Sequence, residues 1–271
     1  MSTFQDEMSA GHAHLDMGRH TDALMAFLAA ESRAEGARAK AEALQMQGVV
    51  QRLRWNFKTA VVSFEEALEA IGLDVLGRIN RPVVEAIAVH SRANLVLAAR
   101  IWRDMGMCYL DMARRRYHSE MGDGQLTKAK TLLYASWWWL DRLDERTEAS
   151  ASYSFFGEYQ ATVGKRHQGI GKMRRACKRL RGHGSSPLQS LQMFLSGTGS
   201  LHPVYEMNSI VRLARYSAWW RLVYVPRALY LGLRYREQNY AKLIEFCLLV
   251  LGGASLVRRV RAKRQNQKKA S

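Results

Sequence analysis

The sequence predicts an all-α protein built from stacked helical hairpins, with a helical extension at the C-terminal end. The 271 residues include four prolines, and the strong helix formers Ala, Leu, Arg, Met and Glu are abundant. Alternating apolar and polar runs bounded by turn residues, which are typical of strands, do not occur in the sequence. Small residues also recur at a fixed spacing beside one large apolar residue, which is typical of paired helices.

This pattern has four positions, separated by steps of 12, 4 and 3 residues, and it occurs three times. The steps of 4 and 3 keep three positions on one helix face, and the step of 12 returns across a turn to the preceding antiparallel helix. We expect the small residues to set the distance between paired helices, and the large residue to fill the space toward the next hairpin. The copies are Gly11, Ala23, Phe27 and Ala30; Gly48, Ala60, Phe64 and Ala67; and Gly157, Gly169, Met173 and Ala176.

The predicted turns between the paired helices have a consistent chemistry in two copies. Gly18 and Gly164 each follow the first glycine of their copy by seven residues, where a helix ends and reverses. In the second copy the same place is taken by Trp55. The second copy is therefore the weaker one.

With these spacings the chain resembles the tetratricopeptide repeat family over residues 4–37, 41–74 and 150–183. A degenerate copy keeps the second-helix pattern at Ala129, Leu133 and Ser136. Tyr117 stands at its small-residue place, and MGDGQ over 121–125 reads as an enlarged loop between helices. The proline that usually closes a unit is missing. The related pentatricopeptide class shares the GRxxxAL-type motif.

The resemblance implies an α-solenoid that presents a groove to a protein partner. The candidates for lining this groove lie on the first helix of the second copy. They are Gln47, Gln51 and Arg54.

Composition divides the chain into four parts. We expect a helical repeat domain over 1–183, a linker rich in Gly, Ser and Pro over 184–202, a basic and aromatic helical region over 203–257, and a basic tail over 258–271.

Positive charge is concentrated at the C-terminal end of a chain whose formal net charge is +17. Residues 1–80 contain 8 basic and 11 acidic side chains, residues 81–160 contain 11 and 10, and residues 161–271 contain 22 and 3. A field of this sign attracts an anionic partner such as RNA, a ribonucleoprotein, an acidic protein face or membrane headgroups. The tail candidates for this contact are Arg258, Arg259, Arg261, Lys263, Arg264, Lys268 and Lys269.

The basic and aromatic region has two interpretations. Its arginines alternate with aromatic residues, which suits stacking on bases and contact with phosphates. The same alternation suits an interfacial helix with snorkelling arginines, so residues 217–257 could lie in or on a lipid bilayer. Residues 243–257 form a 15-residue apolar stretch that reads as a core helix or, alternatively, as a short tail anchor. The arginines in question are Arg212, Arg215, Arg221, Arg227, Arg234 and Arg236.

Catalytic patterns are weak throughout the sequence. GKRHQGIGKM departs from a phosphate-binding P-loop at Arg166 and Met173, where the loop requires a glycine and a hydroxyl. His12 and His14 are two residues apart and diverge on a helix, and the three cysteines have no metal-ligand spacing. We therefore expect no enzyme activity, no cofactor, no metal and no small-molecule substrate.

These observations predict a non-catalytic scaffold or adaptor. Its hairpins would bind a protein partner, and its basic end would dock on an anionic surface of a large assembly. A membrane-associated adaptor is the alternative. The N-terminal sequence has early acids and no apolar signal segment, so we expect an intracellular protein, in the cytoplasm or on an organelle surface.

Overall fold

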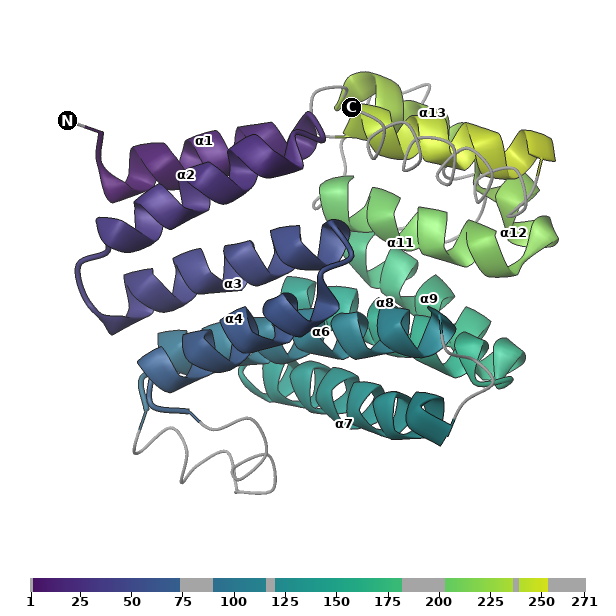
Figure 1. Ribbon diagram of the computed structural model, residues 1–271. Helices are drawn as coiled ribbons and strands as arrows, with labels where there is room; N and C mark the ends of the chain where they lie inside the picture. Colours follow the sequence, from purple (N-terminus) through teal and green to yellow (C-terminus); the bar gives the residue numbers. More distant parts are fainter. Residues whose placement is uncertain (1, 74–89, 116–119, 182–202, 236–238, 253–271) are drawn as a thin grey trace. The chain divides into compact units, whose positions relative to one another are not determined.

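The computed structural model describes residues 2–73, 90–115, 120–181, 203–235 and 239–252 (Figure 1). These ranges are all-α and contain no strand, as the sequence predicts. The chain forms two compact units, Met1–Ser152 and Tyr153–Ser271. The predicted linker at 184–202 lies outside the described residues, whereas the compact units divide between Ser152 and Tyr153.

The first unit is a series of helices in which each described helix from the first to the sixth packs against the next one, and a hydrogen bond between the hydroxyls of Ser136 and Ser152 joins the last two. It contains α1 (Phe4–Asp16), α2 (His20–Ser32), α3 (Ala37–Leu53), α4 (Phe57–Ala70), α6 (Arg92–Arg115), α7 (Glu120–Arg142) and the beginning of α8 (Arg146–Thr162). Phe27 and Val50 are part of the core shared by the first two hairpins.

The second unit has a core of its own. It contains the rest of α8, α9 (Arg166–Arg181), α11 (Pro203–Tyr216), α12 (Ala218–Val223), α13 (Val225–Arg234) and a helix over residues 239–252. Met173 and Cys177 of α9 share this core with Ile210, Leu231 and Phe246. The third copy of the small-residue pattern therefore shares its core with the basic and aromatic region.

Helix ends follow local chemistry. Thr3 caps α1 through a capping box, in which the Asp6 amide donates to Thr3 Oγ1 over 3.2 Å and the Thr3 amide donates to Asp6 Oδ2 over 2.8 Å. The hydrogen bonds from Thr3 lower the pKa of Asp6. The capping box therefore fixes where α1 begins.

Four hairpins turn through one residue in the left-handed backbone region, at Gly18, Trp55, Asp144 and Gly164. In each case the following amide bonds back to a carbonyl five residues earlier, as in Arg19 to His14 over 2.8 Å. The turns predicted at Gly18 and Gly164 lie between paired helices as expected. Trp55 adopts φ 70° although it is not a glycine.

The small-residue pattern marks close helix contacts, with one difference from the expectation. A Cβ added to Gly11 would lie 2.4 Å from the Phe27 ring, and one added to Gly48 would lie 2.6 Å from the Phe64 ring. Each phenylalanine therefore covers the glycine of its own hairpin, rather than filling space only toward the next hairpin as the sequence analysis expected. The missing side chain of the glycine makes room for the aromatic ring.

The third copy differs, since two glycines face each other. A Cβ on Gly157 would lie 2.8 Å from the Gly169 carbonyl oxygen, and a Cβ on Gly169 would lie 2.4 Å from the Gly157 oxygen. Met173 is the large residue beside them, with its Cγ 3.0 Å from the Gly157 position. The backbones of α8 and α9 consequently meet directly.

The expectation for the degenerate copy was wrong at one point. Residues 121–125 are not a loop, because α7 runs through them without interruption. The small residue that lets α7 pack closely against α6 is Gly106 of α6. A Cβ added to it would lie 2.9 Å from Leu133 Cγ. Ala129, Leu133 and Ser136 are all buried on α7. Because α6 and α7 are long, the glycine and its large partner lie farther apart in sequence than in the other hairpins.

Candidate functional site

The groove candidates on α3 have unequal access to a partner. Gln47 is buried, and its Nε2 donates to Glu31 Oε2 over 2.8 Å and to the Phe27 carbonyl over 3.4 Å. Both hydrogen bonds join the side-chain amide of Gln47 on α3 to α2. Gln47 is therefore a packing residue, and its expected role at a groove surface was wrong.

Gln51 and Arg54 lie near the C-terminal end of α3. Gln51 is half-buried and its Oε1 accepts a hydrogen bond from Asn56 Nδ2 over 3.0 Å, whereas Arg54 is exposed. Beside them, the Arg115 guanidinium lies 3.5 Å from the centroid of the Trp55 ring. Of the three candidates, Arg54 is therefore the one with an exposed side chain, at the end of the α3–α4 hairpin.

The first unit also contains a polar network that the sequence analysis did not predict. Glu148 is buried, and its carboxylate pairs with Arg100 over 3.1 Å and with Arg103 over 2.5 Å. Asp104 accepts a hydrogen bond from Gln45 Nε2 over 2.8 Å. The network joins α3, α6 and the start of α8, and its buried charges are paired as burial requires.

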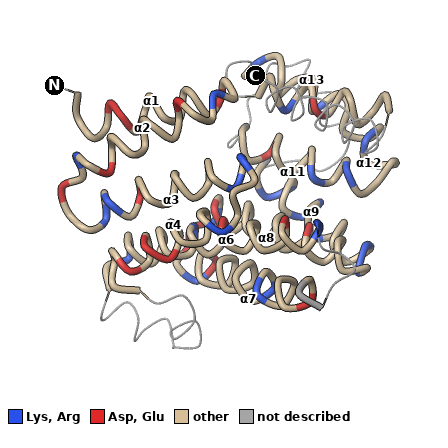
Figure 2. The backbone as a smooth tube through the Cα atoms, viewed as in Figure 1, with Lys and Arg blue, Asp and Glu red and all other residues tan. Residues whose placement is uncertain are grey.

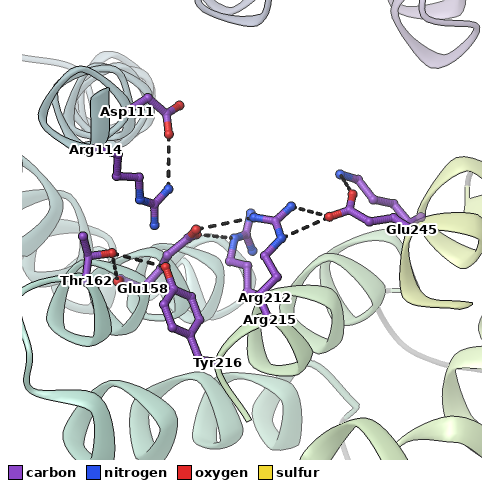
Figure 3. A network of polar contacts seen from close by, with 9 residues as sticks. Asp111, Arg114, Glu158, Thr162, Arg212, Arg215, Tyr216 and Glu245 are labelled. Carbon is purple, nitrogen blue, oxygen red and sulfur yellow. Dashed lines mark hydrogen bonds and ion pairs between the residues drawn. The ribbon is translucent and has the colours of Figure 1, made fainter. Parts of the chain in front are cut away.

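Three arginines of the basic and aromatic region are held in ion pairs inside the second unit. Arg212 and Arg215 both pair with Glu158, over 3.3 and 3.5 Å, and Arg215 also pairs with Glu245 over 2.5 Å (Figure 3). The Arg212 guanidinium additionally lies 3.5 Å from the centroid of the Phe155 ring. These side chains hold α8, α11 and helix 239–252 together.

Arg227 is fully buried against Glu206. The sequence analysis interpreted these three arginines as contacts for phosphates or membrane headgroups. That interpretation was wrong for Arg227, and the pairing of Arg212 and Arg215 gives them a structural role. Glu206 and Glu245, the acidic residues that the structure describes in this region, therefore lie where they neutralise buried or half-buried arginines.

The other basic candidates are distributed differently. Arg221 donates to the Ala214 carbonyl over 2.6 Å, and Arg234 is exposed at the end of α13. Arg236 and the seven tail candidates between 258 and 269 lie outside the described residues.

A cationic surface lies on α9, which at the level of sequence was interpreted only as part of the repeat pattern. Every charged residue of this helix is Lys or Arg. Successive helical positions rotate by about 100°, so the exposed cations in the C-terminal half of α9 share one broad arc opposite the buried Met173, Ala176 and Cys177. We call these exposed cations the cationic face of α9; they are Arg174, Arg175, Lys178 and Arg179.

Aromatic rings support this face. Arg175 and Arg179 lie 5.6 and 5.7 Å from the centroid of the Tyr153 ring, and Arg174 lies 4.8 Å from that of Trp220. These contacts orient the side chains while their charges stay exposed. Figure 2 shows how Lys and Arg follow α9 without an acidic residue between them. A helix that is apolar on one face and whose charged residues on the other face are all Lys or Arg was the sequence signal for this site.

A second exposed surface in the same unit is apolar. Large apolar side chains point to solvent from α12, α13 and helix 239–252, whose other faces share one core. We call them the apolar face of the second unit; they are Trp219, Leu222, Leu229, Leu233, Tyr240, Ile244 and Leu251.

Among the described residues, no group of three or more His, Cys, Asp or Glu side chains is placed to hold a metal ion. Within the same ranges, none of the helices has both the length and the apolar character needed to cross a bilayer. Burial raises the pKa of Cys108 to about 12, so this thiol stays protonated in the folded chain well above neutral pH.

Comparison with known proteins gives no family assignment. No protein-family model matches the chain, and no curated protein matches it.

Proposed function

We propose that this protein is a non-catalytic adaptor of the tetratricopeptide-like type. Its helical hairpins bind a protein partner, and its second unit docks on an anionic surface that carries phosphate groups. The support for the protein-binding half is the exposed end of the α3–α4 hairpin, around Arg54 and Trp55. Hairpin arrays bind partners through such surfaces without a reactive group.

The cationic face of α9 is the observation that carries the proposal. Its guanidinium and ammonium groups project from one rigid helix, and aromatic contacts hold several of them. Arginine forks and lysine charges on a fixed spacing suit a surface with repeated phosphates better than a single small anion. Arg212, Arg215 and Arg227 add little to this surface, since their charges are paired internally.

The experiment measures how the full-length chain binds a single-stranded RNA homopolymer and phosphatidylserine-containing vesicles over a series of salt concentrations. The test variant combines Arg174→Gln, Arg175→Gln and Lys178→Gln. The control variant removes three exposed lysines of the first unit, through Lys40→Gln, Lys58→Gln and Lys130→Gln, so both variants lose the same charge.

We expect the α9 variant to bind the anionic surface about a hundredfold more weakly, because each Lys or Arg near such a surface contributes about 1 kcal/mol. The control should stay within a few-fold of the natural chain. Equal losses in the two variants would show that only net charge matters, and absence of binding to both RNA and vesicles would refute the docking half of the proposal.

A further inference from the structure

The apolar face of the second unit is unusually exposed for a set of large side chains. Trp219 is 67% exposed, Leu233 is 61% exposed and Leu251 is 82% exposed. Scattered exposed leucines are normal, but contiguous helices that all show leucine or tryptophan to solvent mark an interaction surface.

Helical register gathers these side chains along each helix. Tyr240, Ile244 and Leu251 lie within about 40° of one another on helix 239–252, because they are separated by 4 and 7 residues. On α13, Leu229 and Leu233 are one turn apart. A hairpin joins the two helices, since a Cβ on Gly232 would lie 2.6 Å from the Leu243 side chain and Asn239 Nδ2 donates to the Leu231 carbonyl over 3.3 Å.

Charge at the margin of this face is positive or neutralised. Glu245 is the acidic residue at the border of the exposed arc of helix 239–252, and it pairs with Arg215 over 2.5 Å and with Lys242 over 3.5 Å. Arg234 stands exposed beside Leu233. In sequence, the helix is followed by residues 258–271, which contain Lys and Arg but no Asp or Glu.

We infer that the apolar face inserts into the headgroup and upper acyl region of an anionic lipid bilayer, with α12, α13 and helix 239–252 lying along the surface. This inference rests on the proposed function and names lipid as the phosphate-bearing surface. Leucine and isoleucine side chains would enter the acyl boundary, and the Trp219 and Tyr240 rings would sit at headgroup level. The surrounding cations would contact the lipid phosphates and carboxylates.

Lipid fits this combination better than nucleic acid or a protein. Aliphatic side chains offer a nucleic acid neither hydrogen bonds nor stacking, so RNA would leave Leu233 and Leu251 in water. A protein partner could cover an apolar face, but the excess of cations around it complements a surface that is both apolar and uniformly negative. An anionic bilayer provides both properties in one plane.

The test is flotation of the full-length chain with phosphatidylcholine vesicles and with phosphatidylcholine–phosphatidylserine vesicles. The apolar variant combines Leu222→Ser, Leu233→Ser and Leu251→Ser, which are exposed and make small changes to the folded core. Its matched control combines Met25→Ser, Leu28→Ser and Leu53→Ser, which removes three exposed apolar side chains from the first unit.

We expect the natural chain and the control to float with the anionic vesicles. The apolar variant should partition at least about tenfold more weakly, because three side chains lose their transfer out of water. Its binding to the RNA homopolymer should be unchanged if any is present. Flotation of the apolar variant equal to that of the control would overturn the inference.

A second measurement places a specific ring in the membrane. Lipids brominated at the upper end of their acyl chains, next to the headgroups, should quench the emission of the bound natural chain more than that of Trp219→Phe, whose remaining six tryptophans give the background. Equal quenching in both proteins would contradict insertion at α12.

The outcomes separate the inference from the proposed function. Binding to RNA without binding to vesicles would overturn the lipid assignment and leave the anionic-surface adaptor standing. Absence of binding to both would overturn both proposals. Loss of self-association in the apolar variant, with vesicle binding unchanged, would instead identify the face as a contact between two copies of this chain.

Discussion

The Arg227 guanidinium of α13 and the Glu206 carboxylate of α11 form a fully buried pair with two hydrogen bonds. Nε lies 2.9 Å from Oε1 and Nη2 lies 2.8 Å from Oε2, and both residues are 0% exposed. The Tyr230 ring covers the guanidinium, with its centroid 5.0 Å from Cζ. The fork-to-fork geometry compensates two charges that would otherwise be costly inside the unit.

Arg227→Met should destabilise the second unit by about 3–5 kcal/mol, because it leaves the Glu206 charge buried without its partner. The double variant Arg227→Met, Glu206→Leu should recover most of this loss, since both charges are then absent. The free energy of unfolding in urea measures both effects. Arg234→Met on the exposed side of the same helix is the control and should change it by less than about 0.5 kcal/mol. A single variant as stable as the double one would contradict the paired-charge account.

Gly48→Ala should destabilise the first unit by about 1–3 kcal/mol, although alanine is the better helix former. The added Cβ would lie 2.6 Å from the Phe64 ring, so the two helices would have to separate or the ring would have to leave its position. Gly124→Ala is the matched control on α7, where no atom lies within 4 Å of the added Cβ. It should stabilise the chain by about 0.5–1 kcal/mol. Urea denaturation distinguishes the two, and a stabilising Gly48→Ala would refute the close contact.

Sequence reasoning found these glycine contacts because the evidence for them is local. In a hairpin of two short helices, the glycine and its large partner lie at a constant separation, so repetition makes them visible. Gly106 and Leu133 serve the same purpose on longer helices, where that separation no longer applies.

The ion pairs could not be predicted in the same way. Glu206 and Arg227 are 21 residues apart, and Glu158 and Arg215 are 57 apart, so no helical period connects them. Charge counts treated every arginine after residue 161 as available to a partner. Which arginines stay exposed depends on tertiary contacts with three acidic side chains, and the sequence does not show those contacts. The cationic face of α9, by contrast, was visible in principle as an amphipathic pattern.

Gly169→Ala should be more damaging than Gly48→Ala. Its added Cβ would lie 2.4 Å from the Gly157 carbonyl oxygen and 2.7 Å from the Ala161 amide nitrogen, and backbone atoms cannot rotate away as a side chain can. We expect a loss of about 2–4 kcal/mol in the free energy of unfolding of the second unit. Gly171→Ala, two residues along the same helix and with open space around it, should be neutral or slightly stabilising. Equal stabilities of the two variants would show that α8 and α9 are not in backbone contact.

Trp55 combines an unfavourable backbone with a favourable ring contact. Its φ of 70° costs about 1–2 kcal/mol for a residue with a Cβ, while the Arg115 guanidinium stacks 3.5 Å from the ring centroid. Trp55→Ala should be destabilising, because it keeps the strained backbone and loses the ring. Trp55→Gly should be more stable than Trp55→Ala by about 1 kcal/mol, since glycine adopts this conformation freely. Thermal unfolding compares the pair, and a less stable glycine variant would contradict the left-handed assignment.

Cys108 should make stability fall at alkaline pH. Burial is the largest cause that raises the pKa of this thiol to about 12, from 9.0 without the protein environment. Between these values the unfolded chain has lost its proton and the folded chain has kept it, so the folded state binds more protons and its stability decreases as pH rises. The contribution is fully present below pH 9 and declines by at most about 1.4 kcal/mol per pH unit above it.

Other groups titrate in the same range, so the measurement is the difference in free energy of unfolding between the natural chain and Cys108→Ala across pH 8 to 11, taken as roughly the window set by the two pKa values. That difference should shrink as pH rises, because only the natural chain loses this contribution. A difference that is constant over this range would show that the Cys108 thiol ionises equally in both states, and hence that α6 does not shield it from water.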